Sequence, residues 1–172
     1  RDFVSYVVWA CERALERGLL PHTNLGVLSR EELARLREVT ASQGLMLEST
    51  NPDLVVHQGS PSKHPEARLD TIRAAGELRI PFTSGILVGI GETRDDRTAA
   101  LEALAEVQAD YGHIQELILQ NFVPHPRYYG AEVADIADEA TEERWAGDGS
   151  PLADEAPIPT WASEVTLDDM RS

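Results

Sequence analysis

The sequence predicts an α/β protein built from about four parallel βα units. Apolar residues at helical spacing alternate with short apolar runs that are typical of buried strands. The clearest strand candidates recur after roughly thirty to forty residues, which is the spacing expected of βα units. Their apolar runs are nearly continuous, as in parallel strands that are covered on both faces. A chain of 172 residues is long enough to bury one sizeable core.

The first unit is predicted from a helical pattern followed by a polar tripeptide. Between residues 2 and 17, four apolar residues share one helical face: Val4, Val8, Cys11 and Leu15. Gly18 ends this helix. A short strand is then expected to end in His22, Thr23 and Asn24.

The second helix is predicted from its cap. Ser29 and Glu32 have the spacing of a capping box, which marks a helix start. Leu45-Met46-Leu47 follows as a short buried strand, and Glu48 stands at its end.

Two more helix and strand candidates follow in the same alternation. Pro65 suits the first turn of a third helix that runs to about Leu78. The strongest strand signal lies between Pro81 and Ile90. Thr93 caps a long helix to about Tyr111, and a last strand covers 114–122.

Polar residues gather where these strands are expected to end. In parallel α/β proteins, ligands bind at the carboxyl ends of the strands. We therefore expect an active face formed by His22, Thr23 and Asn24, by Glu48, by Gly89, Gly91 and Glu92, and by Gln120 and Asn121.

The composition excludes several classes of function. With 15 basic and 30 acidic residues, the net charge is -15, which argues against binding to nucleic acid or to anionic membranes. No apolar run is long enough to span a membrane, and no leader opens the chain, so a cytoplasmic location is expected. Lys63 is the only lysine. This acidic, lysine-poor composition predicts adaptation to molar salt, with high-GC coding bias as the alternative.

Several common motifs are absent. The dinucleotide fingerprint G-x-G-x-x-G fails because Arg94 stands where its last glycine is required. No phosphate-binding P-loop is present, and the histidines lack the spacing of a metal site. Cys11, the only cysteine, is expected to be a packed core thiol. The two glycines after the strongest strand could serve a ligand or only a tight turn.

Five blocks, in order along residues 5–126, resemble a known family. They are Leu20-Pro21-His22-Thr23-Asn24, Gly44-Leu45-Met46-Leu47-Glu48, residues 80–93, residues 112–116 and Gln120-Asn121-Phe122. The family is the radical S-adenosylmethionine (SAM) enzyme 7,8-didemethyl-8-hydroxy-5-deazariboflavin synthase, in particular its ring-closing subunit. The resemblance implies a partial TIM-like barrel that carries SAM and a [4Fe–4S] cluster and uses an electron donor. It also implies a radical cyclisation of a hydroxybenzyl–ribityl-pyrimidine adduct with loss of ammonia. That adduct would come from a sister subunit.

The resemblance also suggests site residues. Residues 85–92 look like the family's G-x-I-x-G-x-x-E strand, so Gly85, Leu87, Gly89, Gly91 and Glu92 are expected to line the cofactor. Glu48 is expected to contact the ribose or amino-acid part of SAM. A cap or a salt bridge to a nearby arginine is the alternative for this residue. Expected substrate contacts are His22, Thr23, Asn24, Gln120 and Asn121.

The sequence departs from the family at the cluster. The family's C-x-x-x-C-x-x-C loop is missing, so no metal ligand is expected in this chain and the cysteines are expected upstream of Arg1. We expect residues 1–129 to be the central part of the barrel in an interior fragment. Alone, this fragment is expected to be inactive. Residues 130–163 are expected to be an acidic loop or insertion, and 164–172 to begin a truncated helix.

Three alternatives remain open from the sequence. One is another radical SAM enzyme, such as the sister subunit or a biotin-synthase-like protein. Another is a cluster-free half-barrel that serves as a binding module. The third is an ordinary TIM-barrel enzyme with polar strand ends.

Overall fold

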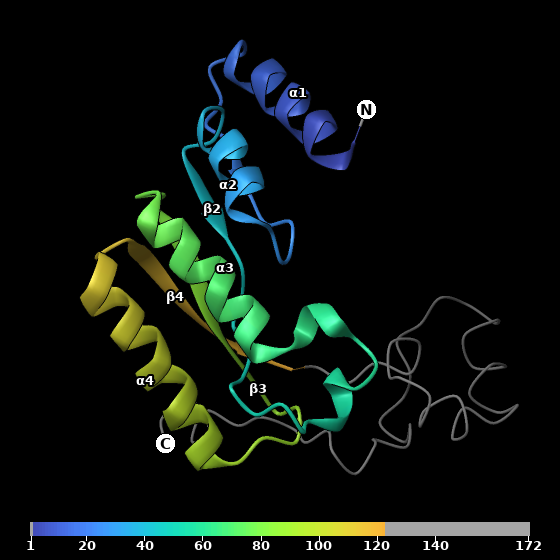
Figure 1. Cartoon of the computed structure of the whole chain (residues 1–172), viewed down its shortest axis with the longest axis vertical. Coiled ribbons are helices and arrows are strands. Elements are labelled where there is room, and N and C mark those ends of the chain that lie inside the picture. The colour runs from blue at the N-terminus through green and yellow to red at the C-terminus, as the bar shows by residue number, and fades with distance from the viewer. Residues whose placement is uncertain (1, 123–172) are drawn as a thin grey trace, which may run out of the picture.

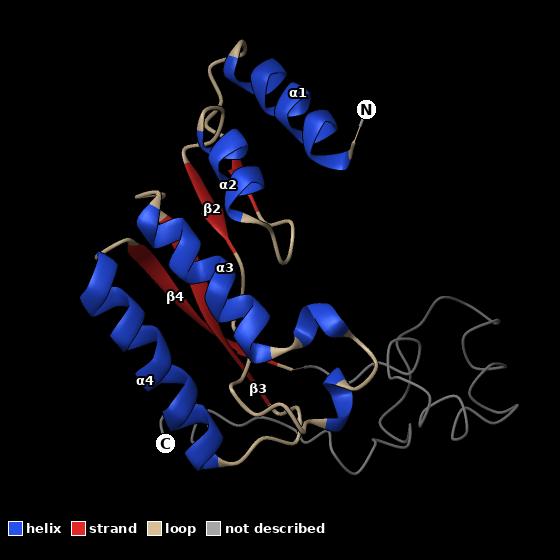
Figure 2. Ribbon diagram, viewed as in Figure 1, coloured by secondary structure: helices blue, strands red, loops and turns tan. Residues whose placement is uncertain are grey.

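The computed structural model describes residues 2–122, which form a four-stranded parallel sheet with helices packed on one face (Figures 1 and 2). The strands follow the chain in the order β1-β2-β3-β4. The element bounds are α1 (Phe3–Leu15), β1 (His22–Thr23), α2 (Arg30–Arg37), β2 (Ser42–Gly44), η1 (Val55–His57), η2 (Pro61–Lys63), α3 (Pro65–Glu77), β3 (Phe82–Val88), α4 (Arg94–Tyr111) and β4 (Ile114–Asn121). The predicted class and the four parallel strands are confirmed.

The helix starts lie where the sequence signals put them. α2 begins after Ser29, whose hydroxyl accepts from the N–H of Glu32 while the Glu32 carboxylate accepts from the N–H of Ser29. Thr93 and Asp96 form the same reciprocal pair before α4. Both capping boxes satisfy backbone donors that a helix start leaves unpaired.

β3 is the central strand of the core. Phe82, Ile86 and Val88 alternate along it and pack under α3 and α4 in one apolar cluster. Figure 1 shows these two helices side by side on the same face of the sheet. Because successive side chains of a strand point to opposite faces, Thr83, Gly85 and Leu87 face away from the helices.

β2 begins earlier than its apolar run predicts. The paired residues are Ser42–Gly44, whereas the prediction was Leu45-Met46-Leu47. Residues 45–48 still run beside β3, with hydrogen bonds of 3.0 Å from Glu48 N–H to the carbonyl of Gly85 and from Leu87 N–H to that of Glu48. The buried amide of Gln43 donates to a backbone carbonyl of α2, and this bond lets a polar residue start a buried strand.

The first strand forms where the sequence predicts it, but its register against the other strands differs from the expected one. β1 holds only His22 and Thr23, and His22 pairs with Ser42 while Gln43 pairs with Phe82. His22 is therefore level with the beginning of β3. The prediction that residues 22–24 form a carboxyl end in register with the other three was wrong, because register is set by pairing across strands and not by the local sequence.

The predicted segments 130–163 and 164–172 lie outside the described residues, and so does the part of 1–129 that follows residue 122. The division into 1–129, 130–163 and 164–172 therefore stays a prediction. Cys11 is a buried thiol of α1, as expected, and burial raises its pKa.

Gly85 provides a direct test of the sheet. A Cβ on this residue would lie 2.0 Å from the carbonyl oxygen of Ile118 in β4. We expect Gly85→Ala to lower the free energy of unfolding by more than about 2 kcal/mol, measured by urea denaturation. Gly18→Ala is the control. Gly18 has a φ of 77° and open space around it, so only about 1 kcal/mol should be lost there. Equal losses would contradict the close approach of β3 and β4.

Candidate functional site

The carboxyl ends of β2, β3 and β4 meet at one edge of the sheet. Glu48 forms an isolated bridge with Ile86, and Gln120 pairs with Leu87. Asn121 pairs with the last residue of β3, directly before Gly89. The structure therefore brings together the predicted residues of these three strand ends: Glu48, Gly85, Leu87, Gly89, Gln120 and Asn121.

The first group of predicted substrate residues lies apart from this edge. His22 pairs with Ser42, whose hydroxyl lies 2.7 Å from Nδ1 of the histidine. Ser42 and Glu48 are six residues apart, which is about 20 Å along an extended chain. Thr23 is buried beside His22, and Asn24 is exposed just after the strand. The expected grouping of residues 22–24 with the other strand ends is therefore not observed.

Three side chains contact the carboxylate of Glu48 at this edge. Its carboxylate lies 2.8 Å from Nε2 of His57, 2.5 Å from Nζ of Lys63 and 3.1 Å from Nη1 of Arg68. Only 12% of its side chain is exposed. The backbone of Glu48 has a φ of 68°, an uncommon conformation for a residue with a side chain. The salt bridge that the sequence left as an alternative is present.

These partners keep Glu48 ionised. Burial alone would raise the pKa of this carboxyl, since a charge is costly away from water. Hydrogen bonds from His57 and Lys63, together with the charge of Arg68, outweigh burial and lower the pKa to about 2. At neutral pH the edge therefore holds a fixed negative charge next to the cationic side chains of Lys63 and Arg68.

The three partners of Glu48 were missed by the sequence reasoning. Arg68 donates to the backbone carbonyls of Met46 and Ser62 and is nearly buried. One signal was available, because Arg68 falls on the apolar face of its helix. An arginine at such a position needs a buried partner. His57 and Lys63 end the short 3₁₀ helices η1 and η2, where the sequence has no comparable pattern.

Glu92 holds the turn that follows β3. Its carboxylate accepts from the N–H of Gly89 at 2.9 Å and of Ile90 at 2.7 Å, and from Nε of Arg97 at 2.8 Å. The side chain is 2% exposed. Gly89 and Gly91 have φ values of 96° and 92°, which favour glycine. The tight turn expected of the glycines is present, and Glu92 positions it from within the protein.

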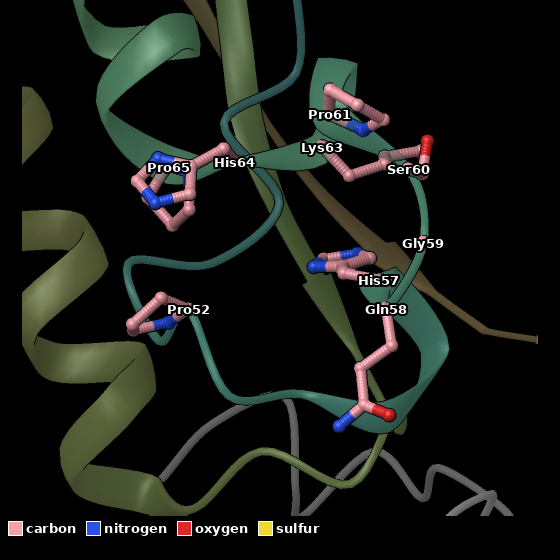
Figure 3. A pocket seen from close by; sticks show the side chains of 9 residues that line it. All are labelled: Pro52, His57, Gln58, Gly59, Ser60, Pro61, Lys63, His64 and Pro65. Carbon is pink, nitrogen blue, oxygen red and sulfur yellow. The ribbon is translucent and has the colours of Figure 1, made fainter.

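A cavity of 330 Å³ opens in the loop beside Glu48 (Figure 3). Its lining residues come from the segment between β2 and the start of α3: Pro52, His57, Gln58, Gly59, Ser60, Pro61, Lys63, His64 and Pro65. The lining carries a lysine and two histidines but no carboxylate. Two of these residues, His57 and Lys63, are also partners of Glu48, which does not itself line the cavity.

Residues 2–122 hold neither a cluster of metal ligands nor a membrane-spanning helix. No group of three or more His, Cys, Asp or Glu side chains in this part is arranged to hold a metal ion. Among the helices of the same part, none combines the length and apolar character needed to cross a membrane.

The sequence matches a known family model over more than half of its length. The model of the Radical SAM superfamily matches residues 1–104.

Relatives of this chain are named 7,8-didemethyl-8-hydroxy-5-deazariboflavin synthase. The Methanosarcina mazei protein is 52% identical over 140 residues, which cover 81% of this chain and 41% of that protein. The Methanosphaerula palustris protein is 55% identical over 141 residues, with 82% and 42% covered. The Archaeoglobus fulgidus protein is 54% identical over 124 residues, with 72% and 38% covered. The chain thus spans about two fifths of the length of these curated relatives.

Solved structures share the fold at low identity. A crystal structure of HydG, a maturase of the [FeFe]-hydrogenase, gives a TM-score of 0.61 at 16% identity and covers 70% of this chain and 29% of that one. A domain of pyruvate-formate lyase-activating enzyme from Bacteroides vulgatus gives 0.53 at 17% identity, with 67% and 90% covered.

Glu48→Gln tests the charged cluster. We expect a loss of about 3 kcal/mol at pH 7, because the buried cations lose their counter-charge. The folded pKa of about 2 lies below the ordinary value of 4.5, so this stabilisation is complete above pH 4.5 and is lost as pH falls from 4.5 to 2. Urea denaturation between pH 7 and 3 should show this loss in the wild type and not in the variant.

The control for this measurement is Glu66→Gln. The Glu66 side chain is 69% exposed and pairs with the half-exposed Arg73 at 3.7 Å. Its replacement should change stability by less than about 0.5 kcal/mol. An equal effect of both substitutions would contradict the role of the buried cluster.

Glu92→Gln tests the glycine turn. The new amide keeps the shape but brings an N–H₂ group toward backbone donors, so about 1–3 kcal/mol should be lost. The amide NMR signals of Gly89 and Ile90 should shift strongly. Asp95→Asn, at an exposed position in the first turn of α4, should leave both signals in place. Unchanged signals in the Glu92 variant would show that the carboxylate does not hold the turn.

Proposed function

The chain belongs to the Radical SAM superfamily, and on that premise we propose that it is part of a 7,8-didemethyl-8-hydroxy-5-deazariboflavin synthase. The observation that carries the proposal is the identity of more than half of the aligned residues with synthases of that name. The polar edge formed by β2, β3 and β4 supports it, because ligands of parallel α/β folds bind at such an edge.

The residues at this edge fit SAM. Glu48 offers an ionised carboxylate that can accept from ribose hydroxyls or pair with an ammonium group. Gly89 and Gly91 leave the end of β3 without side chains, so a flat adenine ring can approach the backbone. When bound, SAM supplies the adenosyl group for radical chemistry. In this proposal Gly85 and Leu87 support the same strand.

The residues of this chain do not fit the cluster. A site-differentiated [4Fe–4S] cluster needs three protein thiolates, and Cys11 is the only cysteine of the sequence. The cluster ligands must therefore come from residues outside these 172. We assign no step of the reaction to the cluster here, and we expect the 172-residue chain alone to be inactive.

The proposed reaction is that of a carbon–nitrogen lyase. The substrate is the hydroxybenzyl–ribityl-pyrimidine adduct, which is cyclised with loss of ammonia. Gln120 and Asn121 can donate to and accept from the pyrimidine carbonyl and N–H groups. His22, Thr23 and Asn24 stay candidate contacts only if the substrate reaches the opposite end of the sheet. An electron donor, a sister subunit and a cytoplasmic location are part of the same proposal.

Anaerobic product analysis of the full-length enzyme that contains this chain tests the proposal. With reductant, SAM and the adduct, we expect 5′-deoxyadenosine, ammonia and a fluorescent deazaflavin. Glu48→Gln should lower the yield of all three at least tenfold, because the ligand loses an ionised partner worth about 1.5–3 kcal/mol. Glu66→Gln should keep full yield.

Other products would identify other enzymes. Formation of the tyrosine adduct would indicate the sister subunit, and a sulfur-inserted product would indicate a biotin-synthase-like enzyme. Absence of 5′-deoxyadenosine under all conditions would contradict the radical assignment and favour a binding module.

We also propose adaptation to molar salt from the net charge of -15 and the single lysine. Salt screens repulsion between surface carboxylates, so the melting temperature should rise as KCl increases. An equal melting temperature in low and in molar KCl would contradict this proposal.

A further inference from the structure

Lys63 is the least anchored of the three side chains that contact the Glu48 carboxylate. Its side chain is 36% exposed, whereas those of His57 and Arg68 are each 6% exposed. Arg68 also donates to two backbone carbonyls, which fix its guanidinium. Within residues 2–122, the ammonium of Lys63 has the Glu48 carboxylate as its one partner. Of the three partners of Glu48, Lys63 therefore breaks the fewest contacts when its side chain moves.

Lys63 also separates Glu48 from the loop cavity. Lys63 and His57 both line the cavity (Figure 3). Both also contact the carboxylate of Glu48, which is not among the lining residues. Oε2 of Glu48 faces His57, whereas Oε1 is shared by Lys63 and Arg68. If Lys63 moved away, Oε1 would keep Arg68 and would turn a free lone pair toward the cavity.

The charges allow such an exchange. Glu48 and Arg68 balance each other inside the protein, so Lys63 is a surplus cation at the border with water. When it leaves, the buried pair stays neutral and the ammonium regains its hydration. A hydrogen-bond donor from a ligand can then take the vacated place on Oε1, since an ionised carboxylate accepts strongly.

We propose that Lys63 is an internal placeholder for a ligand. Its ammonium occupies the place on Glu48 that a donor group of the ligand, an ammonium or a hydroxyl, takes on binding, and binding releases Lys63. No covalent bond changes in this exchange. The choice of SAM as the ligand rests on the proposed function, whereas the exchange itself is a property of the cavity.

Ligand affinity of the 172-residue chain tests the exchange. Lys63→Met removes the competing ammonium and keeps an apolar stem of similar length. Calorimetric titration with SAM should give about three- to fivefold tighter binding to this variant, although its thermal stability falls. A purely structural role would weaken binding and stability together. Arg73→Met is the matched control, since it removes an exposed cation from α3 without touching Glu48. Its affinity should equal that of the wild type.

Two further ligands distinguish the sources of the donor group. S-adenosylhomocysteine keeps the ammonium and the ribose, and adenosine keeps the ribose alone. Tighter binding of SAM and S-adenosylhomocysteine only would assign the place to the ammonium. Tighter binding of all three would assign it to the ribose hydroxyls. Unchanged or weaker binding by Lys63→Met, or no binding to either protein, would overturn the proposal.

A second measurement needs no nucleoside. Lys63→Ala leaves room for a small cation, so propylammonium should raise the melting temperature of this variant in a saturable way. The wild type and Arg73→Ala should show no such rise. Absence of rescue would overturn the proposal even if affinities change. Neither readout involves turnover, so an enzyme that makes no deazaflavin would leave the exchange standing, and failure of the exchange would leave the catalytic assignment standing.

Discussion

One buried carboxylate organises the carboxyl edge of this sheet. Glu48 ends the extended run of β2, bridges to β3 through its backbone and gathers cations from the following loop and from α3. A charge in this position is stable only with such partners. The requirement to pair Glu48 therefore fixes where the loop between β2 and α3 lies, and with it the position of the cavity.

At the end of β3 a second buried carboxylate, that of Glu92, is also stabilised by partners, but here they include backbone N–H groups. Glu92 turns back on its own strand and satisfies the backbone donors of Gly89 and Ile90, while Arg97 neutralises it. The carboxylate of Glu92 is thus fully bonded within the turn that it shapes. The carboxylate of Glu48 is paired with Lys63, a cation that can move away. This difference makes Glu48, rather than Glu92, the residue available to a ligand.

Much of this arrangement could be predicted from local sequence. The capping boxes of α2 and α4 and the apolar run of β3 lie where their patterns indicate, because each is decided by a few neighbouring residues. The register of β1 could not be predicted in this way, since it is defined by pairing with β2. The three side chains that contact the Glu48 carboxylate lie nine, fifteen and twenty residues away in sequence. Only Arg68, on an apolar helix face, gave a signal.

We expect ligands to bind at the edge formed by Glu48 and the end of β3, and not near His22. Amide chemical shifts of the ¹⁵N-labelled chain, recorded during titration with S-adenosylhomocysteine, locate the binding site. Saturable shifts are expected at Glu48, Gly89 and Gly91, with the signals of His22 and Thr23 unchanged. Shifts centred on residues 22–24, with Glu48 and the glycines unaffected, would contradict it.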